Sequence, residues 1–484
     1  MPRTPPPPDF ARAAHDVAVA NGFTPEFEQS VLDQLRTIAG PAANADGVAD
    51  LRALPWSSID NDDSLDLDQI EVAERLADGS IRIQVGIADV DAVVRAGSPI
   101  DAHADHNATS LYAGATVFPM LPEKLSTDFT SLAEGKDRLA LVIEVVVAAD
   151  GSVVSSGVTR ALVRNGAKLA YEDVGGWLEG ERSARLDGDA TLGAQLRLQD
   201  EAARRLKGAR EKCGALELDT IEARPVTQNG RVVDLTVVRK GRGRDLIEDF
   251  MIAANVTIAK FLEAHGASGI RRVVREPERW DRLVALAAQY GATLPSEPDS
   301  PSLARFLSAR RQADPERFPD LSLSVVKLLG PGQYALDRPG KDPGGHFGLA
   351  AHDYSHATAP NRRYADLITQ RLVKAVLAGQ AAPYDDDALA TIAAHCTERE
   401  DAARKVERQM RKVAAAYLLA DRIGERFDAI VTGVNKSGTF VRLLRPPAEG
   451  RVMRGEHGMD VGDKVAVKLV GTNPQKGFLD FERA

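Results

Sequence analysis

The chain has 484 residues, of which 44% are hydrophobic and 27% are charged, and its formal net charge is −9. This length predicts two to four domains of roughly 100–200 residues each. No apolar run approaches the ~20 residues of a membrane helix, and the first residues lack the apolar core of a secretory signal. The two cysteines lie far apart, which argues against a disulfide framework or a Cys-rich zinc site. We therefore expect a cytoplasmic protein that makes no contact with a membrane.

The acidic net charge argues mildly against a nucleic-acid partner, because polyphosphate binding needs a basic surface. Charge can be segregated, however, and basic residues cluster at 239–244, 271–275, 362–363 and 404–412. Each cluster by itself indicates a solvated face. Together they permit a basic channel on an acidic protein.

The first 50 residues predict an extended arm followed by a small helical module. Four prolines favour a disordered arm over 1–8. One helix is expected over 9–21, and a second begins near Thr24 as its N-cap and Pro25 as its first residue. Leu32, Leu35 and Ile38 have the spacing of one buried face. Residues 9–50 are therefore predicted to form a helical module, either helix-turn-helix-like or a simple packed pair.

Residues 51–425 predict one large α+β domain. Three pairs of strands are expected around Asp-Gly or Asn-Gly turns: 70–76 with 81–90, 139–148 with 153–159, and 216–225 with 232–238. Helices are expected near 190–212, 245–264, 278–290, 301–312, 361–378 and 387–425. Hairpins mixed with helices, without regular alternation of the two, indicate the α+β class.

Residues 426–484 change character again. Short strands with Gly-rich turns are expected near 428–434, 438–443, 463–469 and 478–481. This pattern is typical of a five-stranded OB-type barrel.

An acidic run begins at Asp60 and ends at Asp68. Asp66 and Asp68 stand two positions apart at the head of a predicted strand, so they point the same way. Asp60 lies on the preceding loop and can fold back beside them. Like charges this close repel one another, and the usual remedy is a hard cation such as Mg²⁺ or Mn²⁺. Such a site would polarise a phosphoryl oxygen and lower the pKa of a bound water.

Two other interpretations of the run stay open at this point. The first is a solvated acidic loop. The second is an EF-hand calcium loop, because acidic or hydroxyl side chains occupy the positions of that pattern: Asp60, Asp62, Ser64, Asp66, Asp68 and Glu71. Against it, Leu65 stands where an EF-hand needs glycine, and the flanks predict a loop and a strand instead of two helices.

Six short sequence motifs follow one another along the chain. They are Ser58-Ile59-Asp60 through Asp66-Leu67-Asp68, the segment 85–90, the segment 118–122 with Leu125-Ser126, the segment 214–218, the segment 248–255, and the segment 354–367 around Asn361-Arg362-Arg363. In this order they resemble the ribonuclease II / ribonuclease R family, over about residues 50–484. The C-terminal barrel resembles the S1-type RNA-binding domain that ends family members.

The resemblance implies a metal-dependent, hydrolytic 3′-to-5′ exoribonuclease that releases nucleoside 5′-monophosphates from single-stranded RNA 3′ ends. Residue by residue it implies that Asp60, Asp66 and Asp68 bind the metal, and that Asp68 and Arg362 are catalytic. A guanidinium offers a planar fork of donors to a charged phosphoryl transition state, which agrees with the role implied for Arg362. A surface salt bridge is the alternative for Arg362, and Arg363 could exchange roles with it.

The resemblance also implies RNA contacts by Tyr112, Glu407, Arg363 and Phe440. Tyr112 would pack on the terminal nucleotide, because every base offers a π-face to an aromatic ring. Glu407 would lie near the terminal base and ribose, and Phe440 would face RNA from the barrel. Structural alternatives are an ordinary tyrosine at 112, an i, i+4 partner of Arg411 at 407, and a barrel-core phenylalanine at 440.

The run departs from the family signature at one position. The signature ends in two consecutive aspartates, and here the second is Gln69. The amide removes one negative charge, which leaves open whether one or two metals bind and whether Asp62, Asp63 or Glu71 compensates. Gln69 motivates a second hypothesis, an RNA-binding protein with an inactive nuclease site. A calcium-binding regulatory protein is the third.

The front of the chain also departs from the family pattern. Family members usually carry cold-shock-type barrels before the catalytic domain, whereas about 50 residues precede Leu51 here and they predict helices. A compact helical module would leave the RNA entrance more open. We therefore expect the protein also to enter partly duplexed RNA with a 3′ overhang. Separately, we expect a monomer.

Overall fold

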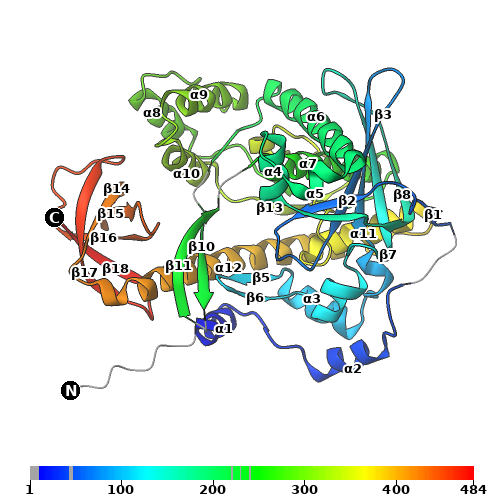
Figure 1. Cartoon of the computed structure of the whole chain (residues 1–484), viewed down its shortest axis with the longest axis horizontal. Coiled ribbons are helices and arrows are strands. Elements are labelled where there is room, and N and C mark those ends of the chain that lie inside the picture. The colour runs from blue at the N-terminus through cyan, green and yellow to red at the C-terminus, as the bar shows by residue number, and fades with distance from the viewer. Residues whose placement is uncertain (1–9, 43–46, 220–221, 229–230, 239–240) are drawn as a thin grey trace.

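A large α+β unit and a small closed barrel, joined by one long helix, form the part of the chain that the computed structural model describes (Figure 1). The described residues are 10–42, 47–219, 222–228, 231–238 and 241–484. This architecture confirms the predicted α+β class and the predicted C-terminal barrel. The arm predicted over 1–8 and the turn predicted at Asn229-Gly230 lie outside the described residues.

A seven-stranded mixed sheet, in the order β1-β8-β7-β4-β3-β2-β9, forms the centre of the large unit. Its strands are β1 (Ala49–Asp50), β2 (Ser57–Asp60), β3 (Gln69–Arg75), β4 (Ile81–Ala88), β7 (Asp137–Val147), β8 (Val153–Arg164) and β9 (Ala167–Ala170). The hairpins predicted around Asp78-Gly79 and Asp150-Gly151 are confirmed as β3–β4 and β7–β8. Nearly every residue of β7 is buried, because this strand lies in the middle of the core.

Helices pack on the sheet and extend from it toward the barrel (Figure 1). They are α3 (Pro99–Asn107), α4 (Tyr171–Leu178), α5 (Ala184–Gly188), α6 (Ala190–Lys212), α7 (Arg242–Ala264), α8 (Trp280–Gln289), α9 (Ser300–Ala313), α10 (Phe318–Leu329), α11 (Tyr364–Leu377) and α12 (Asp386–Leu418). The predictions for α6, α7, α8, α9 and α11 are confirmed to within three residues. Helices α3, α4, α5 and α10 were not predicted. Helix α12 ends at Leu418 instead of the predicted residue 425.

Three pairs of short strands lie outside the central sheet. They are β5 (Leu111–Ala113) with β6 (Thr116–Phe118), β10 (Glu222–Gln228) with β11 (Arg231–Val238), and β12 (Gly269–Val273) with β13 (Gln333–Asp337). The β10–β11 hairpin stands between the large unit and the barrel (Figure 1). It confirms the third predicted hairpin, although its first strand starts at residue 222 and not at 216.

The two N-terminal helices, α1 (Phe10–Ala20) and α2 (Gln29–Thr37), are anchored to different parts of the chain. Helix α1 packs on α12, and α2 packs on α3. The predicted start of α2 at Pro25 is wrong. The backbone N–H of Thr24 donates to the side chain of Asn107, which donates back to the Thr24 carbonyl. This pairing with α3 holds the segment before α2 outside the helix, so Thr24 is not the N-cap.

The C-terminal barrel closes in the order β14-β15-β16-β18-β17. Its strands are β14 (Arg426–Asn435), β15 (Gly438–Leu443), β16 (Glu449–Arg454), β17 (Lys464–Asn473) and β18 (Phe478–Arg483). The barrel is seated on the end of α12. At Gly477, with φ +68°, an added Cβ would lie 2.8 Å from the main-chain carbonyl carbon of Lys412, so only glycine permits this approach.

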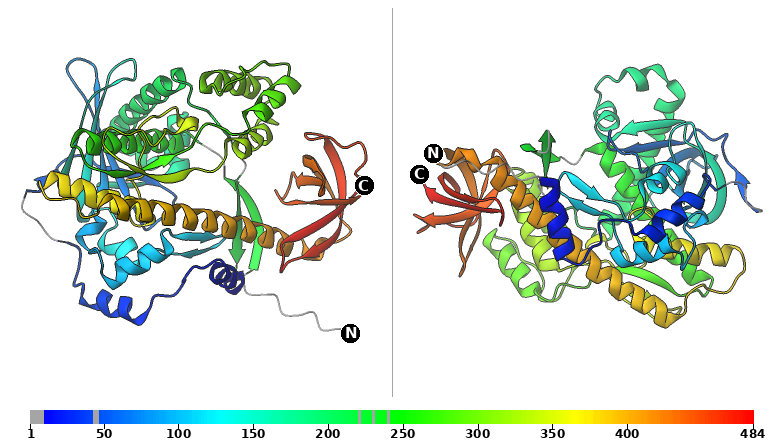
Figure 2. Two further views of the ribbon diagram at one scale, coloured as in Figure 1. Left: turned by 180° about the vertical axis from the view of Figure 1, so that it is seen from behind. Right: turned by 90° about the horizontal axis from the view of Figure 1, so that it is seen from below.

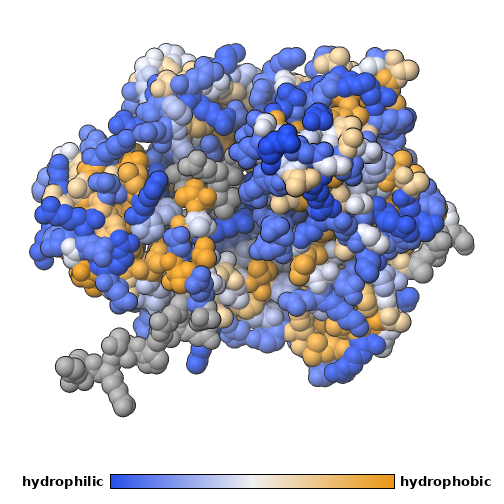
Figure 3. Space-filling view, viewed as in Figure 1, coloured by the Kyte–Doolittle hydropathy of each residue, from blue (hydrophilic) through white to orange (hydrophobic). Residues whose placement is uncertain are grey.

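Helix α12 spans 33 residues and runs from the large unit to the barrel, which is also visible from behind in Figure 2. The face shown in Figure 3 is mostly hydrophilic, with apolar patches over the barrel and over the lower part of the large unit. None of the helices within the described ranges is long and apolar enough to cross a membrane.

Candidate functional site

The acidic run lies between two neighbouring strands of the central sheet. Asp60 is the last residue of β2, and Asp68 directly precedes β3. The flanks are therefore strands, which contradicts the helix–loop–helix arrangement of an EF-hand. Asp68 is only 2% exposed, whereas Asp62 and Asp63 are exposed.

Main-chain contacts fix the end of the run. The Ser131 hydroxyl accepts a hydrogen bond from the Leu67 N–H at 3.1 Å and donates to the Leu65 carbonyl at 2.7 Å. The Ala88 N–H donates to the Asp68 carbonyl at 3.0 Å. The backbone that carries Asp68 is therefore held from both sides, and its carboxylate has a defined direction.

Asp68 meets a segment almost 300 positions away in the sequence. Its carboxylate accepts hydrogen bonds from the Asn361 N–H at 3.3 Å and from Nε of Arg362 at 3.2 Å. The Arg362 carbonyl accepts in turn from the Ser110 N–H at 2.9 Å. The turn before α11 is thus tied both to the acidic run and to the segment that leads into β5.

Arg363, the neighbour of Arg362, has a different partner. Its guanidinium donates to both carboxylate oxygens of Asp366, at 2.9 and 2.7 Å, and Asp366 is fully buried. Asp366 also accepts from the Ala359 N–H at 2.8 Å. Because Arg363 is held at the start of α11, Arg362 is the arginine that faces the acidic run.

Charges of opposite sign shift one another's pKa values at this point. Burial raises the pKa of Asp68 to about 7, while the nearby charge of Arg362 opposes that rise. Burial also raises the pKa of Asp66. Burial lowers the pKa of Arg362, but the neighbouring Asp68 and Tyr112 outweigh this and the net shift is upward. The arginine therefore stays charged, and the carboxylates lie close enough to act on one another.

Tyr112 on β5 belongs to the same site. Burial raises its pKa, and the carboxylates of Asp66 and Asp68 raise it further, whereas a hydrogen bond with Arg362 lowers it. The residue is still 40% exposed. Its hydroxyl therefore lies among the charged groups, while part of the ring remains accessible.

A small network of polar side chains surrounds Asp60. Its carboxylate accepts from the Asn61 N–H at 2.6 Å and from the Ser64 hydroxyl at 2.9 Å. Arg244 of α7 donates to the Asn61 side chain at 2.9 Å, and its guanidinium lies 4.4 Å from the ring centre of Tyr171. Arg244 belongs to the basic cluster at 239–244. Its positive charge was the only feature of the sequence that pointed to this residue.

Two arginines of the basic cluster at 271–275, Arg271 and Arg272, do not contribute to an exposed channel, whereas Arg275 is exposed. Arg271 and Arg272 are 2% and 7% exposed. Arg271 pairs with Asp337 and Asp353, and Arg272 pairs with Glu400. These arginines lie on β12 inside the fold, where their charges are already compensated.

The two remaining RNA-binding predictions lie on other elements. Glu407 is half-buried in the second half of α12, and Phe440 is half-buried on β15 of the barrel. Their predicted roles stay predictions.

The acidic run fits a hard divalent cation in its chemistry. Three carboxylates gather around a single guanidinium, and carboxylate oxygens are the ligands that Mg²⁺ and Mn²⁺ prefer. Across the described ranges, however, no three His, Cys, Asp or Glu side chains stand close enough together to hold a metal ion. Mg²⁺ is commonly held by one or two carboxylates together with waters and phosphates, so a group of three is not needed for the run to fit the ion.

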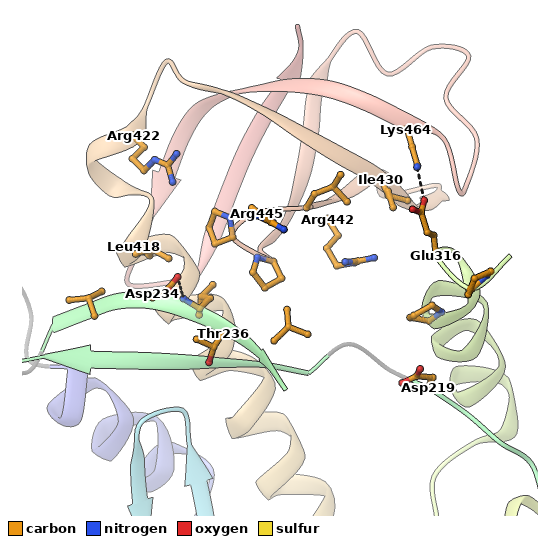
Figure 4. Close-up of a pocket in the computed structure, with 18 residues that line it drawn as sticks. Asp219, Asp234, Thr236, Glu316, Leu418, Arg422, Ile430, Arg442, Arg445 and Lys464 are labelled. Carbon is orange, nitrogen blue, oxygen red and sulfur yellow. Dashed lines mark hydrogen bonds and ion pairs between the residues drawn. The ribbon is translucent and has the colours of Figure 1, made fainter. Parts of the chain in front are cut away.

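A separate cleft of about 1340 Å³ lies between the barrel, the β10–β11 hairpin and α10 (Figure 4). Arg442 of the barrel pairs with Asp320 of α10 at 2.8 Å, and Lys464 pairs with Glu316 at 2.9 Å. Arg445 also lines the cleft. No residue of the acidic run does, so the cleft is not the place where the carboxylates act.

Comparison with known proteins identifies the family. A model of the RNB domain matches residues 48–379, and a model of the RNase II-type exonuclease C-terminal S1 domain matches residues 425–484. The chain belongs to the ribonuclease II / ribonuclease R family. The resemblance carried by the six motifs is thereby confirmed, and nucleases of the RNB family depend in general on divalent metals.

Relatives within the RNB family match most of this chain. Ribonuclease R of Thermotoga maritima is 32% identical over 448 positions, covering 88% of this chain and 61% of that protein. Ribonuclease R 1 of Lactococcus lactis is 28% identical over 501 positions, covering 96% and 60%. The chain thus spans about three fifths of the length of these relatives.

A solved structure shares the RNB-family fold. It is Mycoplasma genitalium RNase R in complex with ribose methylated single-stranded RNA. It matches with a TM-score of 0.89 at 21% identity, over 98% of this chain and 78% of that one.

Proposed function

We propose that this chain is a metal-dependent, hydrolytic 3′-to-5′ exoribonuclease that releases nucleoside 5′-monophosphates from single-stranded RNA 3′ ends. The observation that carries the proposal is the contact between buried Asp68 and Arg362, beside the accessible ring of Tyr112. A buried carboxylate, a charged guanidinium and an open aromatic face are what cleavage of a stacked terminal nucleotide needs.

Each side chain has a part in the proposed reaction. Tyr112 packs on the terminal base and positions the last phosphodiester. A water molecule attacks the phosphorus in line, the bond to the preceding 3′ oxygen breaks, and that oxygen takes up a proton. Arg362, whose side chain is 44% exposed, reaches the phosphate and stabilises the charge that develops on it. Arg363 fixes the turn that carries Arg362 by holding Asp366.

Asp60, Asp66 and Asp68 would hold Mg²⁺ or Mn²⁺. When bound, such a cation polarises a phosphoryl oxygen and lowers the pKa of a water molecule. The raised pKa values of Asp66 and Asp68 support this assignment, because buried like charges need compensation. Gln69 leaves the run one carboxylate short of the family signature.

Labelled RNA tests the proposal. Incubation of 3′-labelled and 5′-labelled single strands with Mg²⁺ or Mn²⁺ should release mononucleotides from the 3′ end. Asp68→Asn should abolish turnover and keep RNA binding, whereas the matched control Asp62→Asn removes an exposed carboxylate of the same run and should retain turnover. RNA binding without mononucleotides under either metal would instead support the inactive, RNA-binding alternative.

The second part of the proposal assigns a role to each domain of the chain. Residues 51–425 carry the reaction, and residues 426–484 guide RNA toward it, together with the N-terminal module at 9–50. The cleft beside the barrel, with exposed Arg445 on its wall, supports an RNA path on that side. The enzyme should then degrade partly duplexed RNA that has a short 3′ overhang, and degradation should continue into the duplex region. Stalling several nucleotides before each duplex would contradict this.

A further inference from the structure

Three fully buried polar residues lie near one another close to the acidic run, two on neighbouring strands of the sheet and one on α6. Ser57 of β2 and Glu71 of β3 are direct cross-strand neighbours, so their side chains leave the same face of the sheet. Gln199 of α6 reaches this place, because its Nε2 donates to the Glu71 carbonyl at 3.5 Å. Each of the three residues is 0% exposed.

Four oxygen atoms of this group have no hydrogen-bond donor among the described residues. They are Oγ of Ser57, both carboxylate oxygens of Glu71, and Oε1 of Gln199. A buried acceptor without a donor destabilises the fold, and an isolated buried carboxylate destabilises it more. No lysine or arginine of the described chain forms an ion pair with Glu71, so the group lacks positive charge of its own.

We propose that Ser57, Glu71 and Gln199 form a pocket for a monovalent metal cation, K⁺ or Na⁺. The donors are one carboxylate, one amide oxygen and one hydroxyl oxygen, all of them hard ligands. A single positive charge balances the single carboxylate, whereas a divalent ion would leave an uncompensated buried charge. The pocket is distinct from the acidic run, since it shares none of Asp60, Asp66 and Asp68.

The pocket also bears on the acidic run. Ser57 begins β2 and Asp60 ends it, so a cation that joins Ser57 to β3 and α6 fixes the short strand carrying Asp60. The Asp60 carboxylate is near enough to Glu71 to add to the burial that raises the pKa of Glu71. A positive charge in the pocket therefore relieves repulsion between these two carboxylates.

The test compares thermal unfolding of the full chain in KCl, NaCl and N-methyl-D-glucamine chloride at equal ionic strength, without divalent metal or RNA. K⁺ or Na⁺ should raise Tm by about 2–4 °C with saturation. Glu71→Gln keeps the shape of the side chain and removes its charge. This variant should have the same Tm in all three salts. The matched control Glu74→Gln, on the same strand with a 63% exposed side chain, should keep the difference between salts.

A direct readout keeps the test decisive if Glu71→Gln fails to fold. Crystals of the unsubstituted protein soaked in RbCl should show anomalous density between the three side chains, and Ser57→Ala should weaken it. Equal Tm values in all three salts, together with an infrared carbonyl band of a protonated carboxylic acid, would overturn the proposal in favour of a neutral Glu71. A pocket filled by Mg²⁺ but not by Rb⁺ would overturn the monovalent assignment.

Discussion

The acidic run and the cleft beside the barrel are built in opposite ways. At the run, Asp68 is buried and held by groups from segments that are distant in the sequence, including the turn of Asn361 and Arg362. The cleft is open and about 1340 Å³ in volume, and two ion pairs join the barrel to α10 and to the segment directly before it. This contrast fits the proposal that RNA passes through the large hollow and that the chemistry takes place at the small charged site.

The difference predicts how each region responds to mutation. Removing one partner of a buried ion pair leaves the other charge uncompensated, which strongly lowers the free energy of unfolding. Partly exposed ion pairs contribute little, because water and salt screen them. Substitutions near Asp68 should therefore change rates and stability strongly, whereas substitutions in the cleft should change RNA affinity weakly.

The largest contrast is expected between Arg362 and Arg363. Arg362→Ala should lower kcat by about 10²–10³-fold, because it removes transition-state donors from a partly exposed side chain. It should also lower Tm, because it leaves buried Asp68 without its cation. Arg363→Ala should cost on the order of 2 kcal/mol of stability, because it leaves fully buried Asp366 without its cation. Steady-state kinetics and thermal unfolding separate the two. An unstable Arg362→Ala with a normal kcat would reverse the assignment.

Tyr112 should have the next largest effect. Tyr112→Ala should weaken binding of the RNA 3′ end by about 10-fold, since stacking on an aromatic ring contributes about 1–3 kcal/mol per base. Tyr112→Phe keeps the ring and is the control, so its KM should stay close to that of the parent. A loss of equal size in both variants would show that the hydroxyl, beside Arg362, is what matters.

The pH dependence of metal binding sharpens the picture of the buried site. Burial raises the pKa of Asp68 to about 7, above its ordinary value of 3.8. In the metal-free protein this carboxyl's contribution to stability therefore falls as the pH rises from about 4 to about 7. Below pH 7 a cation must displace the proton from the Asp68 carboxyl group. Above pH 7 the carboxylate is already deprotonated and can bind the cation directly. Mg²⁺ or Mn²⁺ should thus raise Tm more at pH 8 than at pH 6, and Asp68→Asn should flatten that difference.

The smallest effects are expected in the cleft. Arg445→Ala should weaken binding of long single-stranded RNA a few-fold and lower the slope of log affinity against log salt by about one. Cleavage of short RNA should not change. Arg426→Ala is the control, because Arg426 is an exposed barrel arginine that does not line the cleft. Equal effects of both variants would show that net barrel charge, and not the cleft, attracts RNA.

Local patterns in the sequence were enough to predict much of the fold. The turns at Asp78-Gly79 and Asp150-Gly151 located two hairpins, and Gly-rich short strands located the barrel. Long helices such as α6 were found because their periodicity persists over many residues. The acidic run was visible because its residues are neighbours along the chain.

Only the tertiary structure decided which partners these groups meet. The sequence left Arg362 and Arg363 interchangeable, and the contact of Arg363 with Asp366 separated them. It placed a helix start at Thr24, but Asn107, 83 positions away, bound that backbone instead. Glu71 was one of several compensating candidates until the pairing of β2 with β3 placed it opposite Ser57. Spacing along a chain specifies the chemistry that is present, whereas burial and long-range pairing determine which charges face one another.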